Sequence, residues 1–269
     1  MWIAPDPLGH IQAIGTDAAG RRQYLYHPLW REKRDRTKFE RALDLASTLT
    51  AARVQVTRDL RSDGPTRERA LAAAFRILDT ASPRVGGERY LESNGSFGLT
   101  TLLGSHVDVT KDSVSIHFRG KGGIEWQAEF EDHDLAHVLK SLKRRGPTAR
   151  LLAWKDGEEW HPLAAHDVND YVRDRTKGEF TAKDFRTLRG TIVAAESLAA
   201  SGTSTVRRVR QAAISKAFVD ASVVLGNTPT IAKKSYVDPR VIERYRRGVT
   251  IEVSRGSSPE RALRELLGY

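Results

Sequence analysis

The 269-residue sequence contains no cysteine, which excludes disulfide bonds, thiolate zinc ligands and a cysteine nucleophile. No apolar run approaches the roughly 20 residues that span a bilayer, so we predict no membrane partner. The first residues also lack a basic segment followed by an apolar one, which would mark a secretory signal. These absences favour a cytoplasmic protein.

Motifs for nucleotides and metals are missing as well. No GxxxxGK[ST] pattern occurs, so nothing predicts a nucleotide cofactor or its hydrolysis. His133 and His137 stand four residues apart but lack the HExxH frame of a helical zinc site. No nucleophile elbow supports a serine hydrolase. We therefore predict neither a cofactor nor a bound metal.

Positive charge is in excess, with 44 Lys and Arg against 34 Asp and Glu, a formal net charge of +10. Hydrophobic residues make up 39% of the chain, which is enough for a packed core. The charge favours an anionic partner, and nucleic acid ranks ahead of a membrane surface because no basic amphipathic anchor stands out.

Residues 1–28 are rich in glycine, proline and aromatic residues, and the pattern predicts short strands near 11–14 and 23–26. We interpret this segment as the remnant or end of a β-rich N-terminal domain. Apolar residues at helical spacing then predict a helix over about 35–61. A second helix is expected between a capping residue, Thr66, and a breaking one, Pro83.

Residues 103–130 alternate between apolar and polar and are interrupted by turn sequences, which predicts an antiparallel β-meander. From residue 133 the pattern predicts helices, several opened by a capping residue followed by proline, as at Thr228-Pro229 and Asp238-Pro239. The expected fold class is α+β. A mainly helical domain would span 29–269, with its small sheet at about 103–130.

A few chemically capable side chains stand at expected element junctions. Arg84 follows a proline at a helix end, Lys121 lies between glycines at a hairpin tip, Arg186 is near the start of a capped helix, and Tyr236 ends a short helix. Taken singly, each has an ordinary structural explanation. Arg84 could pair with Glu88, the lysine could be a solvated turn residue, and the tyrosine could be a core aromatic.

Together with their neighbours, these residues carry a family resemblance. The sequence stretches concerned run in order along almost the whole chain: Gly20-Arg21-Arg22-Gln23-Tyr24-Leu25-Tyr26, Arg84-Val85-Gly86, Tyr90, the stretch 92–102, Phe118-Arg119-Gly120-Lys121, Lys183-Asp184-Phe185-Arg186-Thr187, and Leu225-Gly226-Asn227-Thr228-Pro229 leading to Ser235-Tyr236. In their order and spacing the sequence resembles the type IB DNA topoisomerases of the small poxviral and bacterial branch.

The resemblance implies roles for five residues around a scissile phosphate. Tyr236 would be the nucleophile that forms a 3′-phosphotyrosine, and Arg84 with Arg186 would bind the phosphate oxygens. Lys121 would protonate the leaving 5′-oxygen. Asn227 stands where the poxviral enzymes have histidine. An amide can still donate a hydrogen bond to a phosphate oxygen but cannot carry charge, so we expect it to act only as a hydrogen-bond donor.

The resemblance also implies DNA contacts, which would come from the following residues: Gln23, Tyr24, Tyr26, Tyr90 and Lys183. Family members carry further residues before the position of Trp2, so this chain is expected to start inside a DNA-clamp domain. The implied partner is duplex DNA, and one complete site per chain permits a monomer.

Elementary chemistry agrees with these roles. A planar guanidinium meets two phosphate oxygens at once and stays charged. A phenol, whose pKa is normally about 10, becomes a better nucleophile beside cations that lower this pKa. An alkoxide leaving group needs a proton from a positioned acid.

Two alternatives remain at the sequence level. A tyrosine recombinase or integrase shares the tyrosine, the paired arginines and the hairpin lysine, but its second arginine box usually reads His-x-x-Arg. Here Lys183 stands three residues before Arg186, which favours the topoisomerase. A DNA-binding protein without catalysis is the second alternative. It would explain the positive net charge, but not the tyrosine that is matched in order with two arginines and a hairpin lysine. Sequence stretches such as His27-Pro28-Leu29-Trp30 resemble the bacterial members of the family more than the viral ones, so the resemblance implies a bacterial, nucleoid-associated protein.

Overall fold

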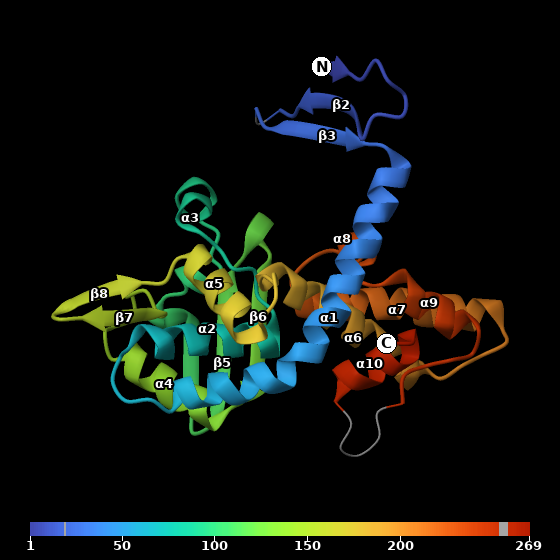
Figure 1. Ribbon diagram of the computed structural model, residues 1–269. Coiled ribbons are helices and arrows are strands. Elements are labelled where there is room, and N and C mark those ends of the chain that lie inside the picture. The colour runs from blue at the N-terminus through green and yellow to red at the C-terminus, as the bar shows by residue number, and fades with distance from the viewer. Residues whose placement is uncertain (19, 253–257) are drawn as a thin grey trace. The chain divides into compact units, whose positions relative to one another are not determined.

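The computed structural model describes residues 1–18, 20–252 and 258–269 (Figure 1). Two compact units are present, residues 1–41 and residues 42–269. Helix α1 (Pro28–Leu60) contains the boundary between them. This helix begins earlier than the predicted residue 35, since a proline is well suited to the first helical position.

The first unit contains a three-stranded antiparallel sheet in the order β1-β2-β3. Its strands are β1 (Trp2–Ile3), β2 (Ile11–Thr16) and β3 (Arg22–Tyr26). The strands predicted near 11–14 and 23–26 are confirmed, whereas β1 was not predicted. That residues 1–28 form the end of a DNA-clamp domain stays a prediction.

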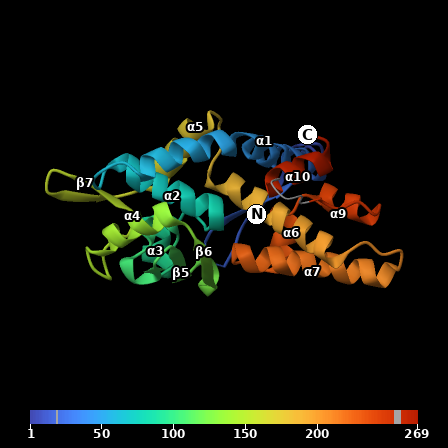
Figure 2. The same cartoon turned by 90° about the horizontal axis from the view of Figure 1, so that it is seen from below.

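The second unit is mainly helical, and the predicted α+β fold class is confirmed. After α1, the α-helices in the described ranges are α2 (Arg67–Ala81), α3 (Glu88–Asn94), α4 (His133–Lys143), α5 (Ala165–Thr176), α6 (Ala182–Ser201), α7 (Arg207–Leu225), α8 (Pro229–Ser235), α9 (Pro239–Arg246) and α10 (Pro259–Leu267). Short 3₁₀ helices occupy Leu99–Thr101, Gly104–His106 and Lys121–Gly123. Figures 1 and 2 show α6 and α7 side by side.

The predicted β-meander is present as an antiparallel sheet in the order β4-β5-β6. Its strands are β4 (Val107–Thr110), β5 (Ser113–Arg119) and β6 (Glu125–Glu131). The register pairs Phe118 with Trp126, and both side chains are buried. After residue 133 the chain is mostly helical, as predicted, but β7 (Ala153–Asp156) and β8 (Glu159–Pro162) form a further hairpin that was not predicted.

The core of the second unit surrounds α2, whose alanine-rich sequence lets neighbouring elements approach closely. Phe75 on this helix is fully buried and meets Phe185 of α6 edge-to-face, with ring centroids 5.3 Å apart. Such aromatic pairs stabilise a packed core beyond the area they bury. The middle of α2 and the start of α6 are thereby held together.

Side-chain caps fix where the helices of the second unit begin. Thr66 accepts a hydrogen bond from the Arg69 N–H at the start of α2, as its sequence predicted. Thr228 caps α8 and Asp238 caps α9, each followed by proline. Helix α8 ends at Ser235 and α9 begins at Pro239, so Tyr236 lies in the short link between the two helices. In the described ranges, no helix is both long and apolar enough to cross a membrane.

Candidate active site

Tyr236 is held by its backbone against α6. Its side chain is 7% exposed. The single proton of the Thr191 hydroxyl is shared between the Thr187 carbonyl at 2.9 Å and the Tyr236 carbonyl at 3.0 Å. The same hydroxyl accepts from the Asp238 N–H at 3.2 Å. At Gly190, a β-carbon would come within 3.0 Å of the Tyr236 Cβ atom. The glycine therefore allows the tyrosine segment to lie directly on the helix.

Arg84 is placed by a turn and by a close backbone contact. Ser82 adopts a left-handed conformation, with φ 51°, and ends α2. The Arg84 carbonyl then accepts from the Leu99 N–H at 2.9 Å. Gly86 and Gly98 pack so tightly that a β-carbon on Gly98 would lie 2.5 Å from the Gly86 Cα atom. The segment 84–86 and the segment 98–99, which are both among the stretches that carry the family resemblance, are thus in direct contact.

Arg186 is a buried guanidinium that links two loops. Its side chain is on α6 and is 3% exposed. The Nη1 atom donates to the Ser82 carbonyl and the Nη2 atom to the Leu225 carbonyl, both at 2.7 Å. Its buried Nε atom has no hydrogen-bond partner among the described residues. The guanidinium therefore holds the Ser82 and Leu225 carbonyls in place, and its Nε–H group is still without an acceptor among the described residues.

The two arginines and the tyrosine converge. Arg84 Nη1 lies 3.5 Å from the Tyr236 Oη atom, at the long end of hydrogen-bond range, and the Cζ atom of Arg186 lies 5.0 Å from the tyrosine ring centroid. Burial by itself raises the pKa of Tyr236, but the charges of Arg186 and Arg84 outweigh it and bring this pKa below its usual value. Burial also lowers the pKa of Arg186.

Asn227 follows α7 and has an unusual amide. Its backbone N–H donates to the Ser222 carbonyl at 3.0 Å. Its side-chain nitrogen and oxygen are both buried, and neither has a hydrogen-bond partner within the described ranges. An unpaired buried amide costs free energy, so this side chain destabilises the fold unless a further group pairs with it. Leu225, two residues earlier, accepts the hydrogen bond from Arg186.

Lys121 lies at the tip of the β5–β6 hairpin, as predicted, and its side chain is exposed. No hydrogen bond or ion pair joins it to Tyr236, Arg84 or Arg186 among the residues that the structure describes. The body of the hairpin does reach α7, since Trp126 Nε1 donates to the Val224 carbonyl at 3.2 Å. Lys121 therefore belongs to a hairpin that is fixed to the end of α7, three residues before Asn227.

The expected DNA-contact residues are distributed over both units. In the first unit, the Gln23 amide donates to Asp17, Tyr24 is 44% exposed, and Tyr26 stacks on Trp30 with ring centroids 4.5 Å apart. In the second unit, Tyr90 on α3 is 60% exposed, and Lys183 is exposed in the first turn of α6. Their contacts with DNA stay a prediction.

Sequence reasoning missed the residues that hold the site together. Thr191, Gly190 and Trp126 were not singled out, although the sequence shows a Gly-Thr pair one helical turn after Arg186 and a tryptophan in an inward strand position. Glu88 was considered as a partner for Arg84, but it forms an ion pair with Arg150. The guanidinium of Arg84 is accordingly directed to Tyr236 instead.

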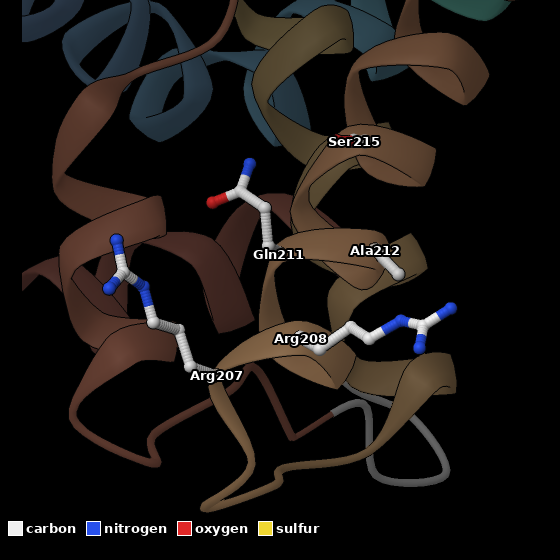
Figure 3. A pocket seen from close by; sticks show the side chains of 5 residues that line it. All are labelled: Arg207, Arg208, Gln211, Ala212 and Ser215. Carbon is white, nitrogen blue, oxygen red and sulfur yellow. The ribbon is translucent and has the colours of Figure 1, made fainter.

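A surface pocket is found away from this site, on the amino-terminal half of α7 (Figure 3). It is lined by Arg207, Arg208, Gln211, Ala212 and Ser215. Arg208 stands 17 residues before Leu225, about 25 Å along the helix. In the described ranges, no three His, Cys, Asp or Glu side chains gather as a potential metal site.

Comparisons with known proteins identify the family. The family model for the catalytic core of eukaryotic DNA topoisomerase I matches residues 27–254, which is more than half of the chain. The DNA topoisomerase 1B of Acanthamoeba polyphaga mimivirus is 29% identical over 91% of this chain and 75% of its own length. The DNA topoisomerase 1B of vaccinia virus (strain Copenhagen) is 22% identical over 88% and 73%.

A cellular relative is also similar, although over less of its length. The DNA topoisomerase 1 of Mycosarcoma maydis is 24% identical over 59% of this chain and 17% of its own. All of these relatives are named as topoisomerases, and none as a recombinase. Together with the converging tyrosine and arginines, the family match shows that the chain belongs to the type IB DNA topoisomerases.

Proposed function

We propose that the chain relaxes supercoiled duplex DNA by cutting one strand transiently and resealing it, with Tyr236 as the nucleophile. The observation that carries this proposal is the placement of the Tyr236 hydroxyl beside Arg84 and Arg186, which lower its pKa. A phenol next to two guanidiniums is suited to attack a phosphodiester, because the same cations stabilise the charge that develops on phosphorus.

The cleavage step begins when the phenol gives its proton to water and its oxygen attacks the phosphorus. An Oη–P bond forms and the P–O5′ bond breaks, which leaves a 3′-phosphotyrosine. Lys121 donates a proton to the departing 5′-oxygen. Arg84 and Arg186 hold the non-bridging oxygens, and the Asn227 amide N–H donates to one of them. Each of these donors is a side chain of this chain.

Resealing is the same step in reverse. While the strand is open, its 5′-hydroxyl end rotates about the intact strand and releases supercoils. The hydroxyl then attacks the phosphorus and returns its proton to Lys121. The Oη–P bond breaks, and the departing phenolate regains its proton from water. Because the ester keeps the energy of the broken phosphodiester, the cycle consumes no ATP, and we propose that it needs neither a cofactor nor a metal ion.

DNA would be held by both units. Gln23, Tyr24 and Tyr26 on the first unit and Tyr90 and Lys183 on the second are suited to positioning contacts with the phosphate backbone. Since all the proposed catalytic groups come from one chain, we propose a monomer. We also propose that the protein acts on the nucleoid in a bacterial cytoplasm; the net charge of +10 suits binding to DNA there.

A plasmid-relaxation assay tests this function. We expect the purified protein to relax supercoiled plasmid in EDTA without ATP, and Tyr236→Phe to bind the plasmid but leave it supercoiled. Moderate salt should speed turnover by helping release, and high salt should prevent binding. Relaxation that stops in EDTA would overturn the metal-free proposal, and an active Tyr236→Phe protein would overturn the role of the phenol.

A further inference from the structure

The tip of the β5–β6 hairpin has few contacts that could fix Lys121. The turn is closed by the Gly120 N–H, which donates to the Ile124 carbonyl at 2.8 Å. Gly122 and Gly123 both have φ of 75°. The side chain of Lys121 itself has no hydrogen bond or ion pair among the described residues. Its position therefore depends on how the base of the hairpin is anchored.

Trp126 provides that anchor. It pairs with Phe118 across the last rungs of the β5–β6 ladder, with ring centroids 5.0 Å apart, and it is 5% exposed. Its indole lies against Gly226, where a β-carbon would come within 2.6 Å of the Trp126 Cδ1 atom. Gly226 has φ of 58°, so this position needs glycine both for its backbone conformation and for the space that the indole occupies.

The end of α7 connects this anchor to the tyrosine. The last carbonyls of a helix lack partners within the helix. Here the Val224 carbonyl accepts from Trp126 Nε1 at 3.2 Å, and the next carbonyl, that of Leu225, accepts from Arg186 at 2.7 Å. Arg186 in turn lies over Tyr236. Consecutive peptide groups thus tie the lysine hairpin and the tyrosine to one helix end.

We propose that Trp126 is a positioning residue that sets the distance between the Lys121 amine and the oxygen leaving the phosphate held at Tyr236. The inference rests on the proposed function, in which Lys121 is the acid. Proton transfer requires heavy atoms within about 3 Å, and a displacement of about 1 Å can slow a reaction by about 100-fold. Loosening the indole anchor should therefore impair protonation more than any other part of the reaction.

A substrate that needs no protonation separates this role from general support of the fold. We would measure single-turnover cleavage of two duplexes, one with oxygen and one with sulfur at the bridging 5′ position of the scissile phosphate. A thiol ionises near pH 8.5, far more readily than an alcohol, so a thiolate departs without an acid. The variants are Trp126→Phe, which keeps a ring but loses the N–H donor, and Phe118→Leu, which keeps Trp126 but removes the ring that packs against it.

We expect Trp126→Phe to slow cleavage of the oxygen substrate by about 10-fold or more and of the sulfur substrate by less than about 3-fold. Phe118→Leu should show the same selectivity, and it carries the test if Trp126→Phe does not fold by thermal melting. Trp154→Phe, in β7, is the matched control, since its ring packs on His161. It should behave as the unmodified protein on both substrates.

Lys121→Ala distinguishes failure of this inference from failure of the proposed function. Its defect should be large on oxygen and small on sulfur. If Lys121→Ala is equally slow on both, the lysine is not the acid, and the proposal for Trp126 fails with it. If sulfur rescues Lys121→Ala while Trp126→Phe is unchanged on oxygen or equally slow on both substrates, only the positioning role is overturned.

Discussion

The guanidinium of Arg186 lies over the ring of Tyr236, with its Cζ atom 5.0 Å from the ring centroid. The same guanidinium donates to the carbonyls of Ser82 and Leu225, each at 2.7 Å. These carbonyls stand two residues before Arg84 and Asn227, respectively. One buried side chain therefore orders the segments that carry the tyrosine, the second arginine and the amide.

Arg186→Lys should lose both structure and activity. A single ammonium group has no rigid fork, so it cannot reach both carbonyls and the phosphate in the same geometry. We expect cleavage to slow by about 100-fold or more and the free energy of unfolding to fall by about 2 kcal/mol. Single-turnover cleavage and denaturant unfolding measure the two effects. Unchanged stability would show that the two carbonyl contacts contribute little.

The phenol of Tyr236 should ionise before an ordinary tyrosine. Below its pKa the hydroxyl is neutral, and rising pH produces the phenolate. Because Arg186 and Arg84 together lower this pKa against the effect of burial, the phenolate should form below the usual value of about 10. The difference in ultraviolet absorption between the unmodified protein and Tyr236→Phe isolates this group during titration. Arg84→Ala should move the transition to higher pH, and an identical transition in that variant would contradict the electrostatic cause.

Asn227→Ala should separate stability from activity. The amide nitrogen and oxygen are buried without partners among the described residues, so removing them should leave the melting temperature unchanged or raise it. Cleavage should slow, because a donor to the phosphate is lost. Asn227→His should largely keep cleavage, since an imidazole can donate in the same place. Equal cleavage rates for all three proteins would remove this residue from the site.

Thr191→Val should displace the tyrosine segment. The variant keeps the shape of the side chain but leaves the Tyr236 carbonyl and the Asp238 N–H without their hydroxyl partner. Each unpaired buried group costs about 1–3 kcal/mol. We expect lower stability and slower cleavage, measured as for Arg186→Lys. Thr191→Ser keeps the hydroxyl and is the matched control. If Ser and Val variants behave alike, the hydroxyl has no positioning role.

Local signals in the sequence predicted much of the fold. Thr228 and Asp238 cap their helices through their own side chains, and a proline at the next position reinforces each start. The alternation of apolar and polar residues predicted the β4-β5-β6 sheet, because every second side chain of a strand faces the core. The β7–β8 hairpin was missed, and the early start of α1 at Pro28 was not anticipated.

The contacts that assemble the site could not be read from local patterns. Arg186 binds backbone carbonyls, which every residue possesses and no sequence motif distinguishes. The contact between Trp126 and Gly226 joins positions 100 residues apart. The resemblance pointed to Arg84, Arg186 and Tyr236, which the structure brings together, without showing what holds them. The roles of the candidate catalytic residues and of the DNA-contact residues stay predictions.

The most direct test is to identify the residue that becomes attached to DNA. A duplex labelled on the scissile strand is trapped during cleavage, the complex is denatured and digested, and the labelled peptide is sequenced by mass spectrometry. We predict one adduct, with the DNA 3′-phosphate on Tyr236, and none with Tyr236→Phe. An adduct on another residue, attachment through a 5′-phosphate, or an adduct that persists in Tyr236→Phe would contradict the account.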